Sequence, residues 1–399
     1  SRCIGPSSDY LASPHVMEND LLILGGGAAG LSLARRLAEQ GATAPRTLVL
    51  ESRVDYADDR TWCFWMHPSA QLTHLVRRRW AKVSLASSTE RVLVDCAEFP
   101  YALLPSGGFY QESRELLAQS ERVRLALGVA VHGAPRKVDG LWEVETSTGV
   151  HRARWIVDTR PSAPPAAGAA VLWQSFLGVE VECTGPVFDP TVAEIMHFTT
   201  GEAGQILFHY LLPLSPTRAL LEVTAFAPAP AGPDVFRAEL TRFIEQRLEG
   251  RPYRIRREEH GILPMGLPTP TPLADTTYVR AGLMAGGARA SSGYAFQRIQ
   301  RWAEMCARSL AEGRGPQAHA ADGWVLRQMD ALFLQVLRHR PELAPTIFLA
   351  MFRQVAPARL ARFMSDQGTL MDDLAIIAAL PPGPFLRELF RPAPSVVRS

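Results

Sequence analysis

The sequence predicts an α/β protein in three parts: a parallel-sheet domain, an antiparallel sheet and a helical C-terminal region. Three observations support this fold class. A buried strand pattern near residue 20 runs into a glycine-rich turn and a helical repeat, strand-like runs dominate residues 171–226, and helical patterns prevail from Gln297 onward. No internal repeat is evident, so a solenoid or propeller is not indicated.

The size and charge of the chain exclude some classes of protein. With 399 residues, 47% of them apolar, the chain exceeds one ordinary domain and can bury a large core. Its formal net charge is +2 and its arginines are scattered, which is not the pattern of a nucleic-acid-binding surface. The densest basic cluster, residues 77–79, is interpreted as a solvated face, with contact to lipid headgroups as the alternative.

Cysteine usage and hydropathy indicate a protein of the reducing cytoplasm. The 5 cysteines are odd in number and include no Cys-x-x-Cys pair, so neither a disulfide framework nor a zinc or other metal site is predicted. No apolar run approaches the roughly 18 residues that span a bilayer. Residues 1–16 have no core pattern and precede Met17 and the first strand, so we expect a disordered extension there.

The first strand opens a βαβ unit. Residues 20–24 form a short apolar run, residues 31–38 repeat at helical spacing, and Gly41 ends that helix. Residues 47–50 then give a second buried strand that closes with Glu51.

The turn between the first strand and the helix has the pattern Gly-x-Gly-x-x-Gly. Glycine leaves the backbone bare, so a pyrophosphate can approach the free N–H groups and the dipole at the helix N-terminus. Glu51 lies 21 residues after Gly30, where an acid can hold a ribose hydroxyl. The alternative is that the glycines serve only a tight turn. The residues predicted to contact a dinucleotide here are Gly25, Gly27, Ala28, Ala29, Gly30 and Glu51.

FAD is favoured over NAD because the long chain returns twice to this domain. One return is the strand that ends at Asp158, and the other is the strand that leads into Gly286 and Gly287. An alternative role for Asp158 is that of a loop cap. The first domain is therefore predicted to be a Rossmann-type FAD-binding domain built from separate segments.

A Pro/Ala-rich stretch, residues 161–170, favours a crossing between domains. The strand-like runs that follow predict an antiparallel substrate-binding sheet. The expected organisation is a first FAD-binding part at 17–160, a substrate-binding sheet domain at 171–275, a return to the FAD-binding domain at 276–315, and a helical C-terminal region at 316–399.

Several segments of the chain resemble the lycopene β-cyclases, in the same order and over nearly its whole length. The segments are residues 58–65 (DDRTWCFW), 174–182 (QSFLGVEVE), 211–216 (LLPLSP), 221–224 (LEVT), 261–265 (GILPM), 292–296 (SGYAF) and the helical tail from Met329 to Leu374. The resemblance implies a flavoprotein of the glutathione-reductase-like superfamily.

This resemblance also implies an activity and its requirements. A lycopene β-cyclase closes the ends of lycopene or a related polyene by protonation, as an isomerase, with reduced FAD required but not consumed and NADPH or NADH as the electron donor. The family's proton donor lies in a Leu-Glu-Glu/Asp-Thr-like segment, and Glu222 matches it here. The next position departs from the family, because Val223 replaces a second acid and puts a two-carboxylate scheme in doubt.

The chemistry of protonating a carbon–carbon double bond agrees with this role. The donor must stay protonated near neutral pH, and burial among Leu221, Val223 and Phe226 would raise the pKa of the Glu222 carboxyl. Aromatic faces can stabilise the carbocation. The candidates for that role, which are otherwise core aromatics, are Trp62, Phe64, Trp65 and Tyr210. The histidines nearby, His209 and His260, are interpreted as structural.

Three alternatives stay open from the sequence. A flavin monooxygenase or a prenyl reductase shares the cofactor fold, although the Asp-Gly…Ser-x-x-Arg segment typical of the monooxygenases is missing after Asp158. A cyclase of another terpenoid chain is a second alternative. A flavin-containing binding protein without turnover is the third, and it would leave Glu222 without a purpose.

A water-insoluble polyene must come from a bilayer, which favours a peripheral contact with the membrane surface. The apolar faces of residues 329–337 and 345–352 are candidates for that contact, and core helices are the alternative.

Overall fold

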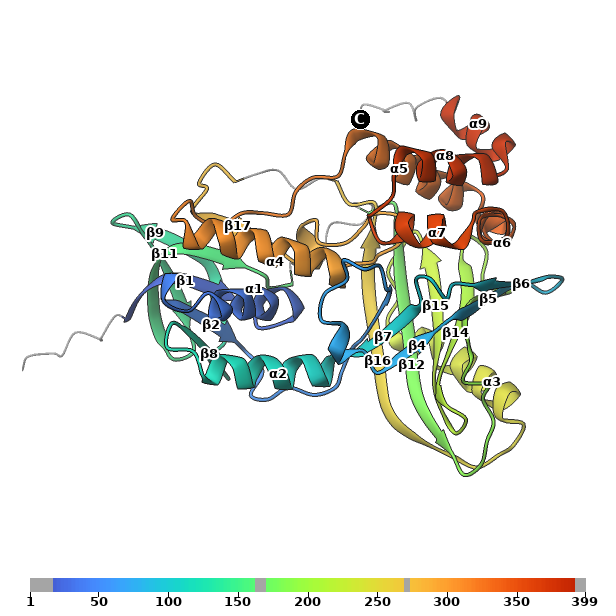
Figure 1. The fold of residues 1–399 in the computed structure, drawn as a ribbon, viewed down its shortest axis with the longest axis horizontal. Helices are drawn as coiled ribbons and strands as arrows, with labels where there is room; N and C mark the ends of the chain where they lie inside the picture. Colours follow the sequence, from blue (N-terminus) through green and yellow to red (C-terminus); the bar gives the residue numbers. More distant parts are fainter. Residues whose placement is uncertain (1–16, 162–169, 269–272, 392–399) are drawn as a thin grey trace, which may run out of the picture.

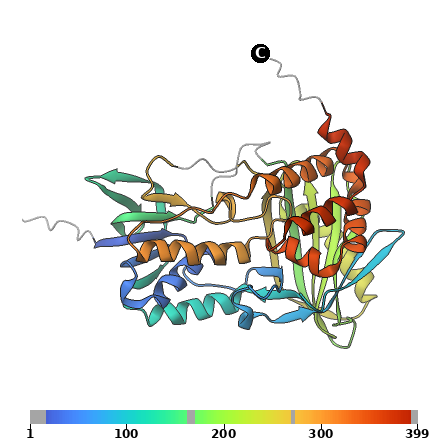
Figure 2. The same cartoon turned by 45° about the horizontal axis from the view of Figure 1, so that its top comes forward.

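The computed structural model describes residues 17–161, 170–268 and 273–391 (Figure 1). The extension expected at 1–16 and most of the Pro/Ala stretch lie outside the described residues. The molecule is elongated: a mixed sheet with its helices occupies one end, and an antiparallel sheet covered by the C-terminal helices occupies the other (Figures 1 and 2). The predicted α/β class is confirmed.

The first sheet has seven strands. They are β1 (Met17–Leu24), β2 (Thr47–Glu51), β8 (Val123–Leu127), β9 (Val131–Val138), β10 (Leu141–Thr146), β11 (Gly149–Asp158) and β17 (Tyr278–Arg280). Their order is β8-β2-β1-β11-β10-β9, with β17 also beside β11, and β8, β2, β1, β11 and β17 are parallel. Helices α1 (Ala28–Glu39), α2 (Ser106–Ala118) and α4 (Phe296–Ala311) pack with this sheet in one apolar core.

The second sheet also has seven strands. They are β5 (Lys82–Ala86), β6 (Arg91–Asp95), β12 (Leu172–Cys183), β13 (Val192–Thr199), β14 (Ile206–Ser215), β15 (Arg218–Ala227) and β16 (Tyr253–Met265). Their order is β16-β12-β15-β14-β13-β5-β6, and all pairs are antiparallel except β13 with β5.

Strands β5 and β6 correct the assignment of residues 17–160 as a whole to the first domain. Both lie within that range but pair in the second sheet, where β5 adds to β13. Without β5, the backbone groups along β13 would form an unpaired edge, and the β5–β6 hairpin satisfies them. Local sequence patterns identify such strands but not the sheet they join.

A third, small sheet lies between the two large ones. Its order is β3-β7-β4, from β3 (Thr61–Trp65), β7 (Tyr101–Pro105) and β4 (Arg78–Trp80). Short 3-10 turns lie at Gly41–Thr43, Thr73–Leu75, Pro233–Phe236, Leu283–Ala285 and Pro341–Leu343.

The second sheet is covered on both faces. Helix α3 (Arg237–Leu248) packs on one face, where Leu221 and Val223 join its core, while Leu220 and Phe226 join a core with the C-terminal helices. Alternate residues of β15 therefore face opposite sides. The C-terminal helices are α5 (Trp324–His339), α6 (Ala344–Gln354), α7 (Pro357–Met364), α8 (Leu370–Ala379) and α9 (Pro382–Leu389). Within the described ranges, no helix has both the length and the apolar character to cross a membrane.

Candidate active site

A cavity of about 1380 Å³ lies between the first sheet, the second sheet and the C-terminal helices. Typical ligand pockets measure about 300–1,000 Å³, so this one has room for more than one small molecule. Its wall begins at Gly25, Gly27 and Ala28 of the glycine turn and reaches the C-terminal helices. The part of the wall formed by the C-terminal helices α5 to α8 is apolar apart from Asp330. Its apolar residues are Met329, Phe333, Phe348, Met351, Phe363, Met364, Ile376 and, just after α8, Leu380.

The glycine turn has the geometry that an anion-binding helix end requires. Helix α1 has no side-chain cap and no acid in its first turn, so its first N–H groups are available to a ligand. A Cβ on Gly27 would meet no atom within 4 Å, whereas one on Gly30 would lie 1.9 Å from the Gly25 carbonyl oxygen. Gly30 thus permits the close packing of turn and helix, and Gly27 leaves open space beside the cavity. Ala29 is buried in the same first turn.

Glu51 lies at the edge of the cavity with its carboxylate held in place. It accepts hydrogen bonds from the backbone N–H groups of Gly26 (2.7 Å) and Arg53 (2.8 Å). Burial acts to raise the pKa of Glu51, but hydrogen bonds and charge from Arg53 outweigh it and lower the pKa. Arg53 also lines the cavity, and no sequence pattern indicated it.

Asp158 and the second glycine turn lie next to the cavity rather than in its wall. Asp158 accepts hydrogen bonds from the Arg160 side chain (2.8 Å) and the Tyr278 hydroxyl (2.9 Å), and it also accepts one from the Arg160 backbone N–H, as a loop cap does. Gly286 has a φ of 91°, and a Cβ on Gly287 would lie 2.6 Å from the carbonyl oxygen of Gly282. These residues shape the loops that present their neighbours to the cavity.

The carboxyl ends of three parallel strands meet at this place. Leu24, Asp158 and Arg280 are register partners across β1, β11 and β17. Open α/β sheets bind their ligands at such ends. Together with the uncapped helix and the space beside Gly27, this arrangement fits a dinucleotide whose pyrophosphate lies at the start of α1.

Glu222 points into the same cavity from β15. Its Oε1 accepts a hydrogen bond from the Thr224 hydroxyl at 2.6 Å. Burial in the cavity wall, with the nearby charge of Glu259, raises the pKa of Glu222 to about 8. The prediction that Leu221 and Val223 contribute to this burial was wrong, because both side chains face α3 on the other side of the sheet.

The four predicted aromatic side chains separate into two groups. Trp62 and Tyr210 line the cavity, and Trp62 stacks on Phe296 with ring centroids 4.6 Å apart. Phe64 and Trp65 are 5% and 3% exposed and do not line it, so they belong to the core. The cavity wall takes its β3 residues from the start of the strand, Thr61 to Cys63, and the strand continues into the core with Phe64 and Trp65.

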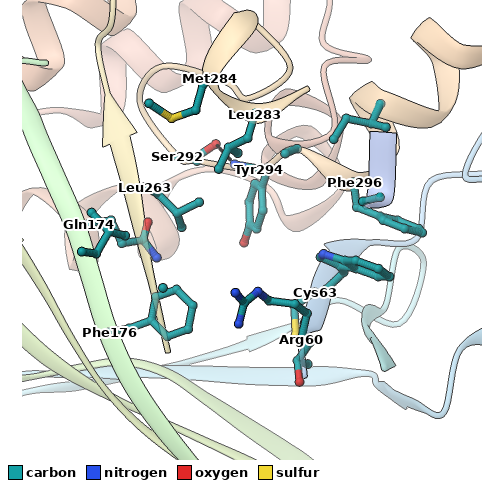
Figure 3. Close-up of a pocket in the computed structure, with 18 of the residues that line it drawn as sticks. Arg60, Cys63, Gln174, Phe176, Leu263, Leu283, Met284, Ser292, Tyr294 and Phe296 are labelled. Atoms are coloured by element: carbon teal, nitrogen blue, oxygen red, sulfur yellow. Dashed lines mark hydrogen bonds between the residues drawn. The ribbon is translucent and has the colours of Figure 1, made fainter. Parts of the chain in front are cut away.

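Other aromatic residues also line the cavity, and no sequence pattern predicted that their side chains would point into it. Figure 3 shows the ring of Tyr294 projecting into the space, with Phe176 and Leu263 on one side and Phe296 and Cys63 on the other. Phe176 and the segment from Tyr294 to Phe296 were among the family-like segments, which was the only indication available. Glu259, Thr61 and Arg60 are polar residues of the wall that the sequence analysis missed.

The fold and the site define an α/β protein with a dinucleotide-type glycine turn beside a large, mostly apolar cavity. The family model described as lycopene cyclase protein matches residues 20–390. The chain therefore belongs to the lycopene cyclase family, and the resemblance found in the sequence is confirmed.

Two curated relatives are each named lycopene beta-cyclase. The one from Pantoea ananas is 26% identical over 391 residues, covering 93% of this chain and 97% of the relative. The one from Paracoccus sp. (strain N81106 / MBIC 01143) is 26% identical over 399 residues, covering 92% and 95%.

Solved structures share the fold at low identity. A geranylgeranyl bacteriochlorophyll reductase-like protein from Thermoplasma acidophilum has a TM-score of 0.60 and 13% identity, covering 94% of this chain and 99% of that one. The flavin-dependent monooxygenase PieE, crystallised with FAD and substrate, has a TM-score of 0.59 and 14% identity, covering 92% and 72%. Such identities establish the fold alone.

Proposed function

We propose that this chain is an FAD-dependent lycopene β-cyclase, which closes the ψ-ends of lycopene into β-rings without net redox change. The observation that supports this most is the position of Glu222. A carboxyl with a pKa of about 8 faces a large, mostly apolar cavity, next to a dinucleotide-type turn. The chain's membership of the lycopene cyclase family and its two relatives named lycopene beta-cyclase favour the same activity.

Glu222 would act as the general acid. Because its pKa is raised to about 8, most of the carboxyl is protonated at pH 7. Its proton adds to the terminal double bond of the polyene, a neighbouring double bond closes the ring on the cation, and an adjacent carbon then loses a proton. One proton enters and one leaves, so the product is an isomer of the substrate.

The wall around Glu222 would protect the cation. Apolar side chains exclude water, which would otherwise add to the cation and yield an alcohol. The aromatic faces of Trp62, Tyr210 and Phe176 line the cavity and can contribute cation–π attraction of about 0.5–2 kcal/mol each.

The FAD would be held by the glycine turn, with Gly27 and the start of α1 at the pyrophosphate and Glu51 at the ribose. The segments around Asp158 and Gly286–Gly287 would position the loops on its other side. In its reduced form, with NADPH or NADH as the donor, FAD would supply a negative charge near the developing cation.

The direct test is anaerobic incubation of the protein with FAD, excess NADPH and lycopene in liposomes, followed by chromatography and mass spectrometry of the pigment. Products of unchanged mass with cyclised ends, γ-carotene or β-carotene, are expected. Addition of hydrogen with stoichiometric loss of NADPH would instead indicate a prenyl reductase, and addition of oxygen a monooxygenase. Unchanged lycopene with bound, reducible flavin would redirect the search to other terpenoid chains.

The proposed substrate requires contact with a membrane, and helices α8 and α9 offer a surface for it. The two helix segments suggested by the sequence are internal: Phe348 and Phe352 of α6 are buried, and Met329 and Phe333 of α5 face the cavity. In contrast, seven apolar side chains of the α8–α9 region are more than half exposed. These residues, the outer apolar patch, are Leu370, Met371, Leu374, Ile377, Leu386, Leu389 and Phe390.

The outer apolar patch lies over the cavity, because Ile376 and Leu380 of the same segment line its wall. A polyene leaving the bilayer beneath α8 would have a short apolar path to Glu222. Arg387 is exposed on α9 and can meet anionic headgroups.

Replacing Leu374 and Leu389 together with Glu is expected to weaken binding to anionic liposomes by at least about tenfold, because two apolar contacts of over 1 kcal/mol each are lost. Vesicle co-sedimentation measures the change. Val235→Glu, at a side chain 63% exposed before α3 on the opposite face of the sheet, is the matched control and should bind as the unmodified protein does. Equal binding by all three proteins would contradict the assignment of this surface.

A further inference from the structure

A second carboxylate lies beside Glu222, and no local pattern in the sequence predicts it. Gly178 of β12 is the register partner of Glu222 on β15 and also of Glu259 on β16. The three residues thus form one row across three neighbouring strands, and paired residues in a row face the same side of a sheet. Glu222 and Glu259 both line the cavity.

Gly178 makes this row possible. A Cβ at position 178 would lie 3.2 Å from the Cβ and 3.3 Å from the Cγ of Glu222. With no side chain between them, the two glutamates share the gap over the middle strand. The Cα atoms of next-but-one strands are about 9–10 Å apart, which leaves the two carboxyl groups within strong electrostatic reach.

The two carboxyl groups have different partners. Glu259 is 4% exposed, and its Oε2 accepts hydrogen bonds from the Thr61 hydroxyl at 2.7 Å and from the Arg257 guanidinium at 2.5 Å. Among the residues that the structure describes, Glu222 has the Thr224 hydroxyl as its only hydrogen-bond partner and forms no ion pair. The guanidinium therefore favours ionisation of Glu259 more than that of Glu222.

Arg257 is shared with a second acid, which fixes its position. Its Nε lies 3.1 Å from Glu180, a carboxylate 1% exposed that also pairs with Arg77 and Arg218. The cation next to the pair is thus held by the fold rather than free to turn toward Glu222.

We propose that Glu259 is a positioning residue: as the ionised partner of Arg257, it keeps the proton of the pair on Glu222. This inference rests on the proposed function for its purpose, namely a donor that stays protonated at neutral pH. It also gives the chain a two-carboxylate site, with the second acid supplied by β16 in place of the position that Val223 occupies.

The pKa of both carboxyls is raised, so the division between them rests on their contacts. Burial first, and then the charge of Glu259, raises the pKa of Glu222. Burial also raises the pKa of Glu259, against the lowering effects of Arg257 and Thr61. The titratable and charged groups that act on Glu222 are Glu259 and Arg257 on β16, Tyr210 on β14 and Cys63 on β3. Arg257 in turn contacts Glu180 on β12 and Asp58, and Tyr210 and Cys63 interact with Tyr101 on β7 and with Tyr294.

The test measures the proton of Glu222 directly and does not depend on turnover. In the FAD-bound protein, the infrared carbonyl stretch of a protonated carboxyl that disappears in Glu222→Gln belongs to Glu222, and its loss with rising pH gives the titration. In Glu259→Gln this titration should move to lower pH by at least about one unit, because a like charge is removed while Arg257 remains.

Two further variants separate electrostatics from structural damage. In Arg257→Gln a second protonated-carboxyl band, one that persists when Glu222→Gln is added, should appear near neutral pH, because a buried Glu259 that has lost its ion pair takes up a proton. Glu258→Gln is the matched control, because Glu258 precedes Glu259 on β16 and pairs with Arg237 outside the cavity. This substitution should leave the titration of Glu222 unchanged.

The outcomes distinguish this inference from the proposed function. A downward shift of the titration in Glu259→Gln, together with the Glu259 band in Arg257→Gln, supports the inference even if lycopene is not cyclised, in which case the proposed function alone fails. If lycopene is cyclised but the band titrates at the same pH in Glu259→Gln, the inference is wrong. Absence of a Glu259 band in Arg257→Gln would likewise overturn it. If Glu259→Gln does not fold, that second band in Arg257→Gln is still required, and its absence refutes the proposal.

Discussion

Glu222→Gln is expected to lower the rate of lycopene cyclisation by about 10²–10⁴-fold, the range that general acids contribute. Glutamine keeps the shape and the contact with Thr224 but has no proton of suitable acidity to donate. Product formation in liposomes measures the loss, and the variant should still be yellow with bound FAD, because Glu222 lies on β15 of the second sheet, whereas the glycine turn follows β1 of the first sheet.

Glu258→Gln is the control for this substitution, since it changes the same residue type on a side chain outside the cavity. It should retain full activity. Cyclisation by Glu222→Gln at more than about a tenth of the normal rate would show that the proton comes from another group.

The pH dependence of cyclisation should follow the protonated form of Glu222. A general acid is active only while protonated, so the rate should be level at neutral pH and fall as pH rises through about 8, where this carboxyl ionises. Initial rates at saturating lycopene across pH 6 to 10, with flavin reduction monitored separately, measure this limb. A rate that rises with pH over the same range would contradict the assigned role.

Gly27→Val is expected to abolish stable FAD binding while the fold persists. The φ of Gly27 is −80°, and its Cβ would enter open space, so the apo protein tolerates a side chain there. That space is where the pyrophosphate is proposed to lie. Loss of two hydrogen bonds from backbone N–H groups to a charged group, at about 1.5–3 kcal/mol each, weakens FAD binding by at least about 100-fold.

Flavin absorbance after purification and the thermal unfolding of the apo protein measure the two effects. Gly232→Val is the matched control, because Gly232 also precedes a helical turn, has a φ of −73° and has open space at its Cβ. It should keep FAD, and both apo variants should unfold within a few degrees of the unmodified protein. Normal FAD content in Gly27→Val would place the dinucleotide elsewhere.

The sequence by itself determined the features that depend on short segments. The βαβ unit, the glycine turn and Glu51 follow from residues within about 30 positions of one another, and the strands around Glu222 from runs of alternating side chains. The assignment of Glu222 came from family-like segments, not from its local pattern, which fits a solvent-facing residue equally well.

Only the tertiary structure decided the features that depend on pairing between distant segments. Local patterns do not specify which strands become neighbours, so residues 17–160 were assigned as a whole to the first domain although β5 and β6 pair in the second sheet. For the same reason the wall of the cavity was predicted with Phe64 and Trp65 in place of Phe176 and Tyr294. The carboxylate row is of the same kind: residues 178, 222 and 259 lie far apart in the chain and meet only through the registers of β12, β15 and β16. Those registers set the environment of each acid. For this reason the sequence identified Glu222 but not Glu259, the residue that we propose keeps the proton on Glu222.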